Sequence, residues 1–485
     1  MNSLLNYLPH QSQQIVLQDE SSGVSLAQLQ ENCLRLSREI MQFDSQCIAI
    51  KLSNCIAWVV LDIAIMQANR IALPLPPFFS SDQQDYAMEK AGCQVLFTDE
   101  PQDNNLLMFR QEIFGRAIYV YKTKIHSPVS IFKQTKKITF TSGSTGQPKG
   151  VCLSFESQLA VARSLCTKID IQAPKHLCIL PLAVLLENIA GVYAPLLSGG
   201  QVVLLTNEQL GYLGGELNDG QRLLSAIDAN QPTSIILVPE LLKYLIMACM
   251  EGWVPPKSLM FIAIGGAHTD RELLRRAWDM GLPVFQGYGL SEAGSVVCLN
   301  SSEYQDGSVG PVLPHIISRC VEGELQIKGP LFLGYLGGAA HNPHSWFATG
   351  DLIGESSKSM NGDLNLQILG RKSNLIINSY GRNINPEWPE SLLLSKPWLQ
   401  QAVVFGEAKP FLIALLWVGK DILDEQVSEH IHMINSYLPD YAQVKRWVRL
   451  SAPLSLSQGY LTPNCKPKRL QIAQGFRNQI LELYN

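Results

Sequence analysis

One segment of this sequence has the residue types that hold phosphate. The segment ITFTSGSTGQPKGV, residues 138–151, places small hydroxyl side chains, three glycines and Lys149 behind a strand-like lead-in. Glycines let backbone N–H groups approach phosphate oxygens closely, hydroxyls add donors, and the lysine adds a mobile positive charge. The phosphates of a nucleotide fit that inventory, although a Ser/Gly-rich stretch taken alone is more often a plain connection.

The order of the residues excludes two common phosphate loops. A Walker loop requires Gly-x-x-x-x-Gly-Lys-Ser/Thr, whereas Lys149 here precedes Gly150 and Val151. A dinucleotide loop requires Gly-x-Gly-x-x-Gly, which the segment lacks. A phosphate site in this segment is therefore of another kind.

Helical and strand-like stretches alternate along the chain that must position this segment. Stretches such as 25–43 and 271–281 have apolar residues at three- and four-residue intervals, as amphipathic helices do. Between them are strand-like runs, at 46–52, 201–206, 233–239 and 259–266. This alternation predicts α/β layers with largely parallel sheets.

The pattern changes towards the C-terminus. From about Gly307, short β-like pieces and turns predict a smaller β-rich subdomain. After Arg371, about 110 residues carry their own strands and helices, a reasonable size for an independent core. We expect a large N-terminal domain over residues 1–371, with α/β layered subdomains plus the β-rich subdomain, and a small α+β C-terminal domain over 372–485.

Composition excludes several classes of protein. The 485 residues, 46% of them apolar, predict at least two folded domains, and a net charge of −4 predicts no nucleic-acid partner. The longest apolar run, 55–68, is interrupted by Asp62 and is shorter than the roughly 20 residues that span a bilayer. It predicts a buried helix, and no transmembrane segment is expected. The start does not resemble a secretion signal and the 11 cysteines form no C-x-x-C pair, so a cytoplasmic protein is expected.

Five motifs in order resemble those of one enzyme superfamily. TSGSTGQPKG (141–150) resembles the phosphate loop of the acyl-adenylate-forming superfamily, which includes acyl-CoA synthetases, adenylation domains of peptide synthetases, and luciferases. The other motifs are GYGLSEAG (287–294), ATGDL (348–352), LGRKSNLIINSYGRNINPEWPE (369–390) and GYLTPNCKPKRL (459–470). The last is similar to the ending of the fatty-acyl-CoA synthetase-like branch, and the resemblance spans nearly the whole chain.

The resemblance implies an AMP-forming acid–thiol ligase. A carboxylate would attack the α-phosphorus of ATP, release pyrophosphate and form an acyl-AMP, whose acyl group then passes to the thiol of CoA. Because both reactants of the first step are anionic, catalysis must chiefly neutralise charge and position the groups. The implied cofactors are ATP, Mg²⁺ and CoA. One alternative acceptor is the phosphopantetheine of an acyl carrier protein, and another reading is a catalytically impaired nucleotide-binding relative.

The resemblance assigns the phosphates of ATP to the first two motifs. Ser291 would contact the phosphates and Glu292 would hold Mg²⁺, since a hard cation prefers oxygen ligands. In isolation, Glu292 is more simply a carboxylate favoured by a helix N-terminus. The loop residues with the implied phosphate role are Thr141, Ser142, Gly143, Ser144, Thr145, Gly146 and Lys149.

Adenosine binding is implied by the middle motifs. Tyr288 would present a flat face to adenine, Asp351 would bind both ribose hydroxyls, and Arg371 would reach the ribose and phosphate. Read alone, the tyrosine is a packing residue and the aspartate a turn former. The positions that would bring backbone close to the nucleotide are Gly265, Gly266, Ala267, Gly287 and Gly289.

The last motif implies the catalytic lysine. Lys466 matches the family's lysine, and its ammonium would reach both the substrate carboxylate and the bridging oxygen of ATP. Lys466 lies close in sequence to Lys468 and Arg469, and the plain alternative for three such neighbouring cations is a solvated basic patch. We expect Lys468 and Arg469 to be surface or CoA-facing charges.

The second step implies a mobile C-terminal domain. Family resemblance implies that this domain rotates about Ser373, so that one bound adenylate serves two reactions. Gly381 would then be the backbone position that lets the pantetheine arm pass. The family usually carries an acid or a lysine at the hinge, and Ser373 departs from that pattern.

Residues 180–200 resemble the segment that borders the acyl substrate in the fatty-acyl branch. The segment is apolar apart from Glu187 and Asn188, and it lacks the aspartate that amino-acid-activating relatives place here. A fatty acid, and a role in fatty acid metabolism, is therefore expected. Val184 and Phe155 stand where the family commonly has histidines. The resemblance therefore implies the adenylation parts but leaves the thiol half-reaction and the chain-length preference open.

Overall fold

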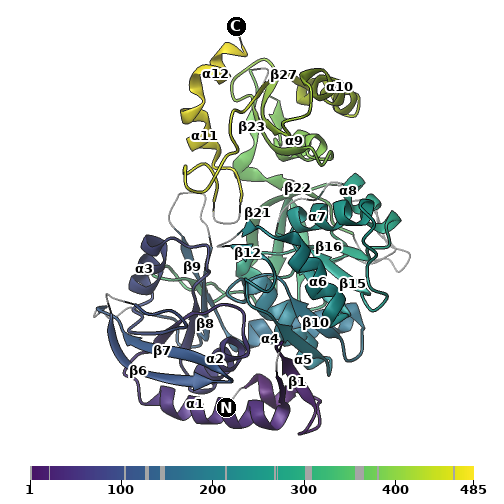
Figure 1. Cartoon of the computed structure of the whole chain (residues 1–485). Helices are drawn as coiled ribbons and strands as arrows, with labels where there is room; N and C mark the ends of the chain where they lie inside the picture. Colours follow the sequence, from purple (N-terminus) through teal and green to yellow (C-terminus); the bar gives the residue numbers. More distant parts are fainter. Residues whose placement is uncertain are drawn as a thin grey trace.

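The structure is a computed structural model of the chain. It describes residues 3–20, 22–102, 105–125, 130–141, 148–213, 216–266, 269, 271–300, 308–354, 365–379, 382–462 and 465–484. Within these residues, two eight-stranded sheets form the large N-terminal body and a three-stranded sheet forms the core of a C-terminal unit. The C-terminal unit lies at the top of the molecule in Figure 1, above the edge where the N-terminal strands end.

The first eight-stranded sheet carries the phosphate-loop segment at one of its hairpins. Its strands, in spatial order, are β20 (Gly334–Tyr335), β9 (Lys149–Leu153), β8 (Lys137–Thr141), β4 (Ile71–Pro74), β3 (Cys47–Lys51), β5 (Val95–Thr98), β7 (Arg116–Lys122) and β6 (Leu106–Ile113). β8 and β9 pair antiparallel, with Thr141 opposite Lys149. The residues between them, 142–147, lie outside the described residues.

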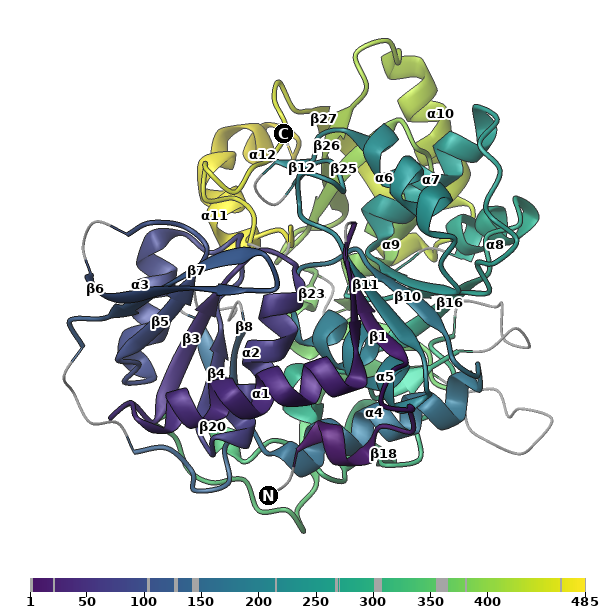
Figure 2. The same ribbon diagram turned by 60° about the horizontal axis from the view of Figure 1, so that its bottom comes forward.

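Three helices accompany this sheet: α1 (Leu26–Met41), α2 (Ile56–Gln67) and α3 (Ser81–Lys90). α1 begins at Ser25, whose side chain accepts from the backbone of Gln28 in a capping box. α2 has buried residues all round, as the apolar run 55–68 predicts, and α1 packs along it in Figure 2. The predicted buried helix is confirmed.

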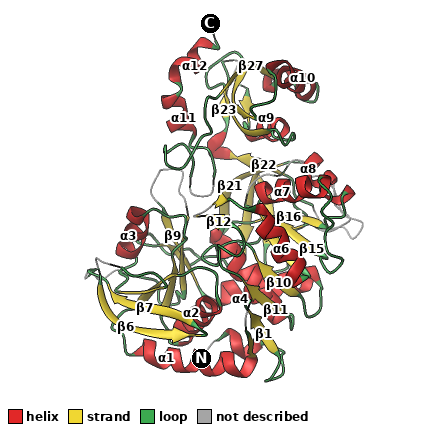
Figure 3. Ribbon diagram, in the orientation of Figure 1, coloured by secondary structure: helices red, strands yellow, loops and turns green. Residues whose placement is uncertain are grey.

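The second eight-stranded sheet is mostly parallel and carries helices on both faces (Figure 3). Its order is β17 (Cys298–Leu299), β16 (Val284–Tyr288), β15 (Phe261–Ile264), β14 (Ser234–Leu237), β10 (Lys175–Cys178), β11 (Gln201–Leu204), β1 (Ile15–Gln18) and β2 (Gly23–Ser25). One face packs against α4 (Phe155–Ile169), the π-helical turn η2 (Glu187–Tyr193) and α5 (Ala194–Leu197). The other packs against α6 (Gly220–Asn230), α7 (Pro239–Met250) and α8 (Arg271–Asp279).

The carboxyl ends of the parallel strands meet at one edge of this sheet. Ligands of open α/β sheets bind beyond that edge. β15 ends at Ile264, two residues before the sequence pattern predicts, because Gly266 adopts a φ of +84° and turns the chain away. β16 ends at Tyr288 and is followed by the short turn η3 (Ser291–Ala293).

The β-rich part and the C-terminal unit follow in the predicted order. A four-stranded antiparallel sheet consists of β18 (Ile317–Val321), β19 (Glu324–Lys328), β21 (Phe347–Ile353) and β22 (Ile368–Arg371). The C-terminal sheet consists of β25 (Leu399–Phe405), β26 (Leu412–Val418) and β27 (Val444–Arg449), with its own apolar core. Its helices are α9 (Glu387–Leu393), α10 (Asp424–Asn435), α11 (Arg469–Gly475) and α12 (Arg477–Glu482).

The remaining elements are short. They are η1 (Leu4–Tyr7), β12 (Tyr212–Leu213), β13 (Glu216–Leu217), η4 (Lys372–Asn374), β23 (Ile376–Ile377), β24 (Asn383–Ile384) and η5 (Asp440–Ala442). Among the helices of the described residues, none is both long and apolar enough to cross a lipid bilayer. The predicted fold class, a large α/β N-terminal part with a β-rich subdomain and a small α+β C-terminal part, is confirmed.

Candidate active site

A cavity of about 580 Å³ lies at the carboxyl edge of the second sheet, and both parts of the chain line it. It brings together residues that lie more than 300 positions apart in the sequence, such as Lys149 and Lys466. The predicted site residues that line it are Thr141, Lys149, Gly265, Gly266, Gly287, Tyr288, Gly289, Ser291, Glu292, Arg371 and Lys466. The predicted residues Ser142, Gly143, Ser144, Thr145, Gly146, Ala267 and Gly381 lie outside the described residues.

Asp351 anchors one polar cluster at this cavity. Antiparallel pairing of β21 and β22 places Asp351 opposite Arg371, whose Nε lies 2.7 Å from Oδ1. The hydroxyl of Tyr288 donates to the other carboxylate oxygen. Burial raises the pKa of Asp351, while Arg371 and the Tyr288 hydrogen bond act to lower it. The carboxylate thus has both oxygens engaged in a largely buried position.

The protons in this cluster can be assigned from the environment. Burial raises the pKa of Tyr288 well above its ordinary value, and the nearby Asp351 raises it further. Tyr288 therefore keeps its proton and serves as a donor at neutral pH. A ribose offers hydroxyl groups of the same kind as this tyrosine, so the cluster has the donor and acceptor set of a sugar site.

Glu292 is held by a tyrosine that the sequence motifs do not point to. The hydroxyl of Tyr335, on β20, donates to Oε1 of Glu292 at 2.7 Å, and the ring of Tyr335 lies 5.6 Å from Nζ of Lys149. The backbone carbonyl of Glu292 accepts from Phe332 at 2.7 Å. Burial, followed by the bond to Glu292, raises the pKa of Tyr335, which therefore stays a donor. The pairing of β20 with β9 across the sheet creates this contact.

Lys466 reaches the cavity from a tight turn of the C-terminal unit. Its backbone N–H donates to Thr462 Oγ1 at 3.0 Å, and its carbonyl accepts from the N–H of Thr462 at 2.8 Å. Desolvation lowers the pKa of Lys466 and Arg371 lowers it further, whereas Glu387 and Asp351 act to raise it. Lys466 is solvent-exposed and also lines the cavity.

The surroundings of Arg469 differ from those expected of a surface or CoA-facing charge. Its guanidinium forms two bonds, of 2.7 and 2.6 Å, to the carboxylate of Glu390 and a third, of 3.0 Å, to the carbonyl of Val404. The prediction of a surface or CoA-facing charge is wrong for this residue. Arg469 instead attaches the start of α11 to α9 and β25, since fork-shaped guanidinium groups pair well with carboxylates.

Val184 and Phe155, which stand where the family commonly has histidines, have different surroundings. Val184 lines the cavity. Phe155, the first residue of α4, is buried and stacks on Tyr7 with ring centroids 6.3 Å apart. Phe155 therefore contributes to packing in the core, and Val184 is the departure that faces the cavity.

A buried ion pair explains why Asp62 interrupts an apolar helix. Nζ of Lys137, the first residue of β8, lies 2.9 Å from Oδ1 of Asp62, and both side chains are 1% exposed. Tyr193 donates to the same carboxylate at 2.7 Å, and Asn188 bonds to both Asp62 and Lys137. This network joins α2, β8 and η2 beneath the cavity.

Comparison with known proteins is decisive at this point. Residues 8–336 match the AMP-binding enzyme family, and residues 373–485 match the AMP-binding enzyme C-terminal domain. The chain belongs to the AMP-binding enzyme family. The match covers more than half of the chain and contains every motif from the phosphate loop to Glu292.

Curated relatives of the chain include CoA ligases. A 2-succinylbenzoate–CoA ligase of Bacillus cereus (strain AH820) is 27% identical over 421 residues, covering 80% of this chain and 81% of the relative. A long-chain-fatty-acid–CoA ligase of Mycobacterium bovis is 22% identical and covers 88% of this chain and 86% of the relative. These findings, with the family match, confirm the predicted acyl-adenylate-forming superfamily and the acid–thiol ligase class.

Solved structures of the same fold cover nearly the whole chain. The O-succinylbenzoate coenzyme A synthetase of Bacillus subtilis in complex with AMP has a TM-score of 0.77 at 23% identity, with 97% of each chain covered. The anthranilate CoA ligase AuaEII in complex with anthranoyl-AMP has a TM-score of 0.77 at 14% identity, covering 98% of this chain and 97% of that one. At these identities, the likeness concerns the fold.

Proposed function

We propose that this chain is an AMP-forming ligase that activates a carboxylic acid as its acyl-AMP and transfers the acyl group to CoA. The observation that carries the proposal is the meeting of Lys466, from the C-terminal unit, with Tyr288 and Arg371 of the N-terminal body around one cavity. Asp351, which bonds to both of the latter, completes the set. The N-terminal body thus offers hydrogen-bonding groups for a sugar, and the C-terminal unit offers the ammonium group of Lys466. A reaction between a nucleotide and an anionic acid requires both.

In the first step, a carboxylate oxygen of the acid forms a bond to the α-phosphorus of ATP. The bond between that phosphorus and the bridging oxygen breaks, and pyrophosphate leaves with the electron pair. Lys466 and Lys149 lower the repulsion between the two anions and stabilise the charge that moves to the leaving group. Ribose hydroxyls would bond to Asp351, and Arg371 would reach the ribose and the phosphate.

The residues present fit a magnesium ion beside the phosphates. Glu292 offers a carboxylate oxygen at the cavity, the ligand type that Mg²⁺ takes, and Tyr335 orients that carboxylate. When bound, the ion supplies charge neutralisation for the phosphate oxygens. One solved relative, the synthetase of Bacillus subtilis, holds ATP and a magnesium ion.

For the second step, we propose that the chain divides into a unit ending at Arg371 and a mobile unit from Lys372 onward. The short turn η4 between them contains Ser373. Rotation there would remove Lys466 from the cavity and bring the segment around Gly381 towards the acyl group. The thiol of CoA would then attack the acyl carbon, and AMP would leave.

The proposed substrate is a compact acid. The expected fatty acid finds support in only part of the curated relatives, several of which are 2-succinylbenzoate–CoA ligases and therefore act on an aromatic acid. The cavity of about 580 Å³ must accommodate the nucleotide and the acid together. An acid of about one ring is the class to which these 2-succinylbenzoate–CoA ligases point.

Exchange of labelled pyrophosphate into ATP tests the first step across aryl acids and fatty acids of graded length. We expect exchange with aryl acids and little with chains longer than the cavity. Mass analysis of the product with CoA, or with a holo acyl carrier protein, then tests the acceptor. Formation of a CoA thioester supports the proposal, and loading of the carrier without CoA thioester would replace CoA with the carrier. Absence of exchange for every acid would favour the catalytically impaired relative.

A further inference from the structure

Three side chains at the inner end of the cavity form a connected chain of hydrogen bonds. Oε1 of Glu187 lies 3.1 Å from Nε2 of His176, and Nδ1 of His176 lies 2.9 Å from Oγ of Ser234. Their residue exposures are 0%, 2% and 7%, so the chain is buried. Of the three, His176 and Ser234 line the cavity, whereas Glu187 lies behind the histidine. We call these residues the Glu187–His176–Ser234 relay.

Strand register places the relay at the end of the cavity remote from the nucleotide site. His176 pairs with Ser234 and Ser234 with Phe261, so the three form one row across β10, β14 and β15. Gly265 lies four residues beyond Phe261 on the same side, at the carboxyl edge. At about 3.3 Å per residue, the relay row is about 13 Å from Gly265.

The side chains between the two ends leave space for a flat group. Ala263 and Gly265 are small, and Phe261 forms an apolar wall beside Ser234, stacked on Phe285 with centroids 4.9 Å apart. Aromatic rings prefer such offset contacts with other rings. Leu165 and Ile169 of α4 also line the cavity. The acyl end of the cavity is therefore apolar up to the polar relay.

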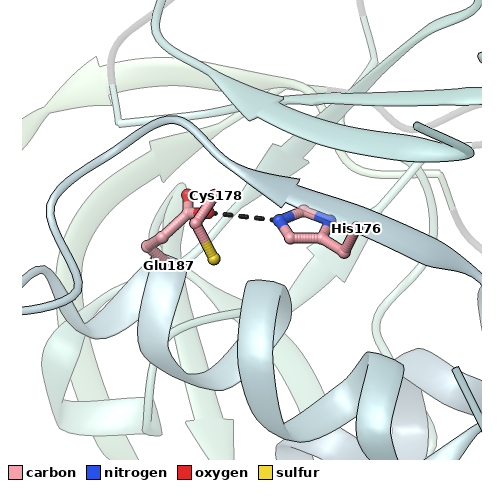
Figure 4. A group of neighbouring side chains, drawn as sticks. All are labelled: His176, Cys178 and Glu187. Atoms are coloured by element: carbon pink, nitrogen blue, oxygen red, sulfur yellow. Dashed lines mark hydrogen bonds and ion pairs between the residues drawn. The ribbon is translucent and has the colours of Figure 1, made fainter. Parts of the chain in front are cut away.

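The local structure around Glu187 brings it to the histidine. Glu187 begins the π-helical turn η2, a rare element that is frequent at functional sites. A side-chain carbon at Gly191 would lie 2.7 Å from both Oε1 of Glu187 and Nε2 of His176, so only glycine allows this contact. Figure 4 shows His176 on its strand directed towards Glu187 on the helix.

The relay leaves Ser234 with bonding capacity towards the cavity. A carboxylate only accepts, so Nε2 carries a proton and the neutral ring accepts the Ser234 proton at Nδ1. The lone pairs of Ser234 then accept from a ligand. If the ring is doubly protonated, Nδ1–H donates to Ser234, whose own hydrogen turns to the ligand. A hydroxyl group, which both donates and accepts, complements either state.

We propose that the relay is a distal subsite that selects acids carrying a hydroxyl group opposite their carboxyl group, and this rests on the proposed function. With about 2.8 Å for the hydrogen bond and about 3.5 Å for contact at Gly265, the acid spans about 7 Å from carboxyl carbon to hydroxyl oxygen. One aromatic ring with its hydroxyl para to the carboxyl-bearing group has this span. The substrate class is therefore a 4-hydroxyaryl acid.

Metal binding is an alternative function for His176 and Glu187 of the relay. Ligand atoms of His176, Cys178 and Glu187 lie within 4.8 Å of one another. Burial and the adjacent Glu187 raise the pKa of Cys178 well above its ordinary value, so a metal ion that bound there would have to displace the thiol proton. Nε2 of His176, the nitrogen nearest Glu187, is also engaged with that carboxylate.

Matched acid pairs test the subsite in the intact enzyme. The pairs are 4-hydroxybenzoate with benzoate, 4-hydroxyphenylacetate with phenylacetate, and 4-hydroxycinnamate with cinnamate. For the best pair, we expect kcat/KM in pyrophosphate exchange to favour the hydroxy acid at least about tenfold, because the deoxy acid makes no hydrogen bond to the side of Ser234 that faces the cavity. Ser234→Ala should reduce that ratio to within about threefold. Ser198→Ala, which removes another serine hydroxyl from the cavity lining, should keep it.

The contrary outcomes separate the subsite from the ligase itself. Exchange with deoxy acids and no preference in any pair would overturn the subsite and leave the ligase standing. If no acid supports exchange, calorimetric binding of the same pairs to the protein with a non-hydrolysable ATP analogue decides the subsite, and equal affinities would reject it. One equivalent of zinc in the purified protein that is lost in Cys178→Ala would assign the cluster to a metal and end the proposal.

Discussion

At the scale of single residues, Lys466 has the surroundings of a cation that acts on anions. It faces the cavity beside Arg371, while the carboxylates Glu387 and Asp351 favour its charge. Lys468, two residues on, is the last residue before α11. The two lysines thus share a segment but differ in their access to the cavity.

Lys466→Ala should lower acid-dependent pyrophosphate exchange by at least about 100-fold, because the first step loses the cation that stabilises the leaving group. Transfer to CoA from supplied acyl-AMP should change by less than about threefold, since Lys466 acts only before rotation. Rapid-quench assays of the two half-reactions measure this. Lys468→Ala is the control for the first step and should leave exchange near normal; equal loss of both steps in Lys466→Ala would contradict the division of labour.

The pH dependence of the first step should report Lys466. Desolvation and Arg371 lower its pKa from 10.5, so the folded protein loses this proton at a lower pH than an ordinary lysine does. Exchange should therefore decline as pH rises through the alkaline range below 10.5, because the reactive form is protonated. Rate profiles between about pH 7 and 10 would show the decline. Lys466→Arg should move it to higher pH, and an identical decline in that variant would exclude Lys466 as its source.

At the scale of elements, the Asp62–Lys137 pair joins α2 to the strand that precedes the phosphate-loop segment. Both groups are buried, and Tyr193 and Asn188 satisfy further bonds of the pair. Removing one member of a buried pair leaves the other charge without compensation. The network therefore fixes the position of β8 relative to the helix layer.

Lys137→Met should lower the free energy of unfolding by about 3–5 kcal/mol, because it leaves the Asp62 carboxylate buried without its cation. The double variant Asp62→Leu with Lys137→Met should recover part of that loss, since neither charge remains. Urea denaturation followed by tryptophan fluorescence measures both. Lys136→Met, at the adjacent half-buried position where, among the described residues, Nζ bonds only to the side chain of Asn69, should cost less than about 1 kcal/mol. A double variant less stable than Lys137→Met alone would show that the unpaired Asp62 carboxylate is not the reason for the loss.

At the scale of the whole molecule, the C-terminal unit adds residues such as Lys466 to a cavity that the N-terminal body mostly lines. Lys372 bonds to Glu324 at 3.0 Å, and Asn374 donates to Glu387 at 2.9 Å, so both sides of Ser373 are attached in this arrangement. In the proposed mechanism, Lys466 would act in this arrangement during the first step, and the second step would need the chain to turn at η4. A substitution that restricts the backbone at Ser373 should therefore slow the second step and not the first.

Ser373→Pro should preserve pyrophosphate exchange to within about threefold and slow acyl transfer to CoA by at least about tenfold. Proline holds φ near −65°, which a short 3₁₀ turn accepts but a large rotation does not. Single-turnover assays of each half-reaction provide the measurement. Ser373→Ala keeps backbone freedom and should behave as the unaltered enzyme. Normal transfer in Ser373→Pro would place the rotation elsewhere.

Much of the candidate site could be predicted because its residues lie in short sequence motifs. The motifs around Gly287, Asp351 and Lys466 have local spacing. Residues of the first and last line one cavity, and Asp351 bonds to Tyr288 and Arg371, which line it too. The helix at 55–68 and the β-rich part after Gly307 follow from periodicity, which is also local. The sequence by itself therefore determined the fold class, the family and the class of reaction.

Tertiary structure alone decided which distant side chains meet. His176 and Ser234 are 58 residues apart, and only the parallel register of β10 and β14 makes them neighbours. The sequence alone predicts a surface charge at Arg469. In the structure, the packing of α11 brings this residue to Glu390, 79 positions earlier. Hydrogen bonds and ion pairs act over a few ångströms, so a one-dimensional pattern reveals the groups that need partners, whereas the packing of strands and helices selects the partner.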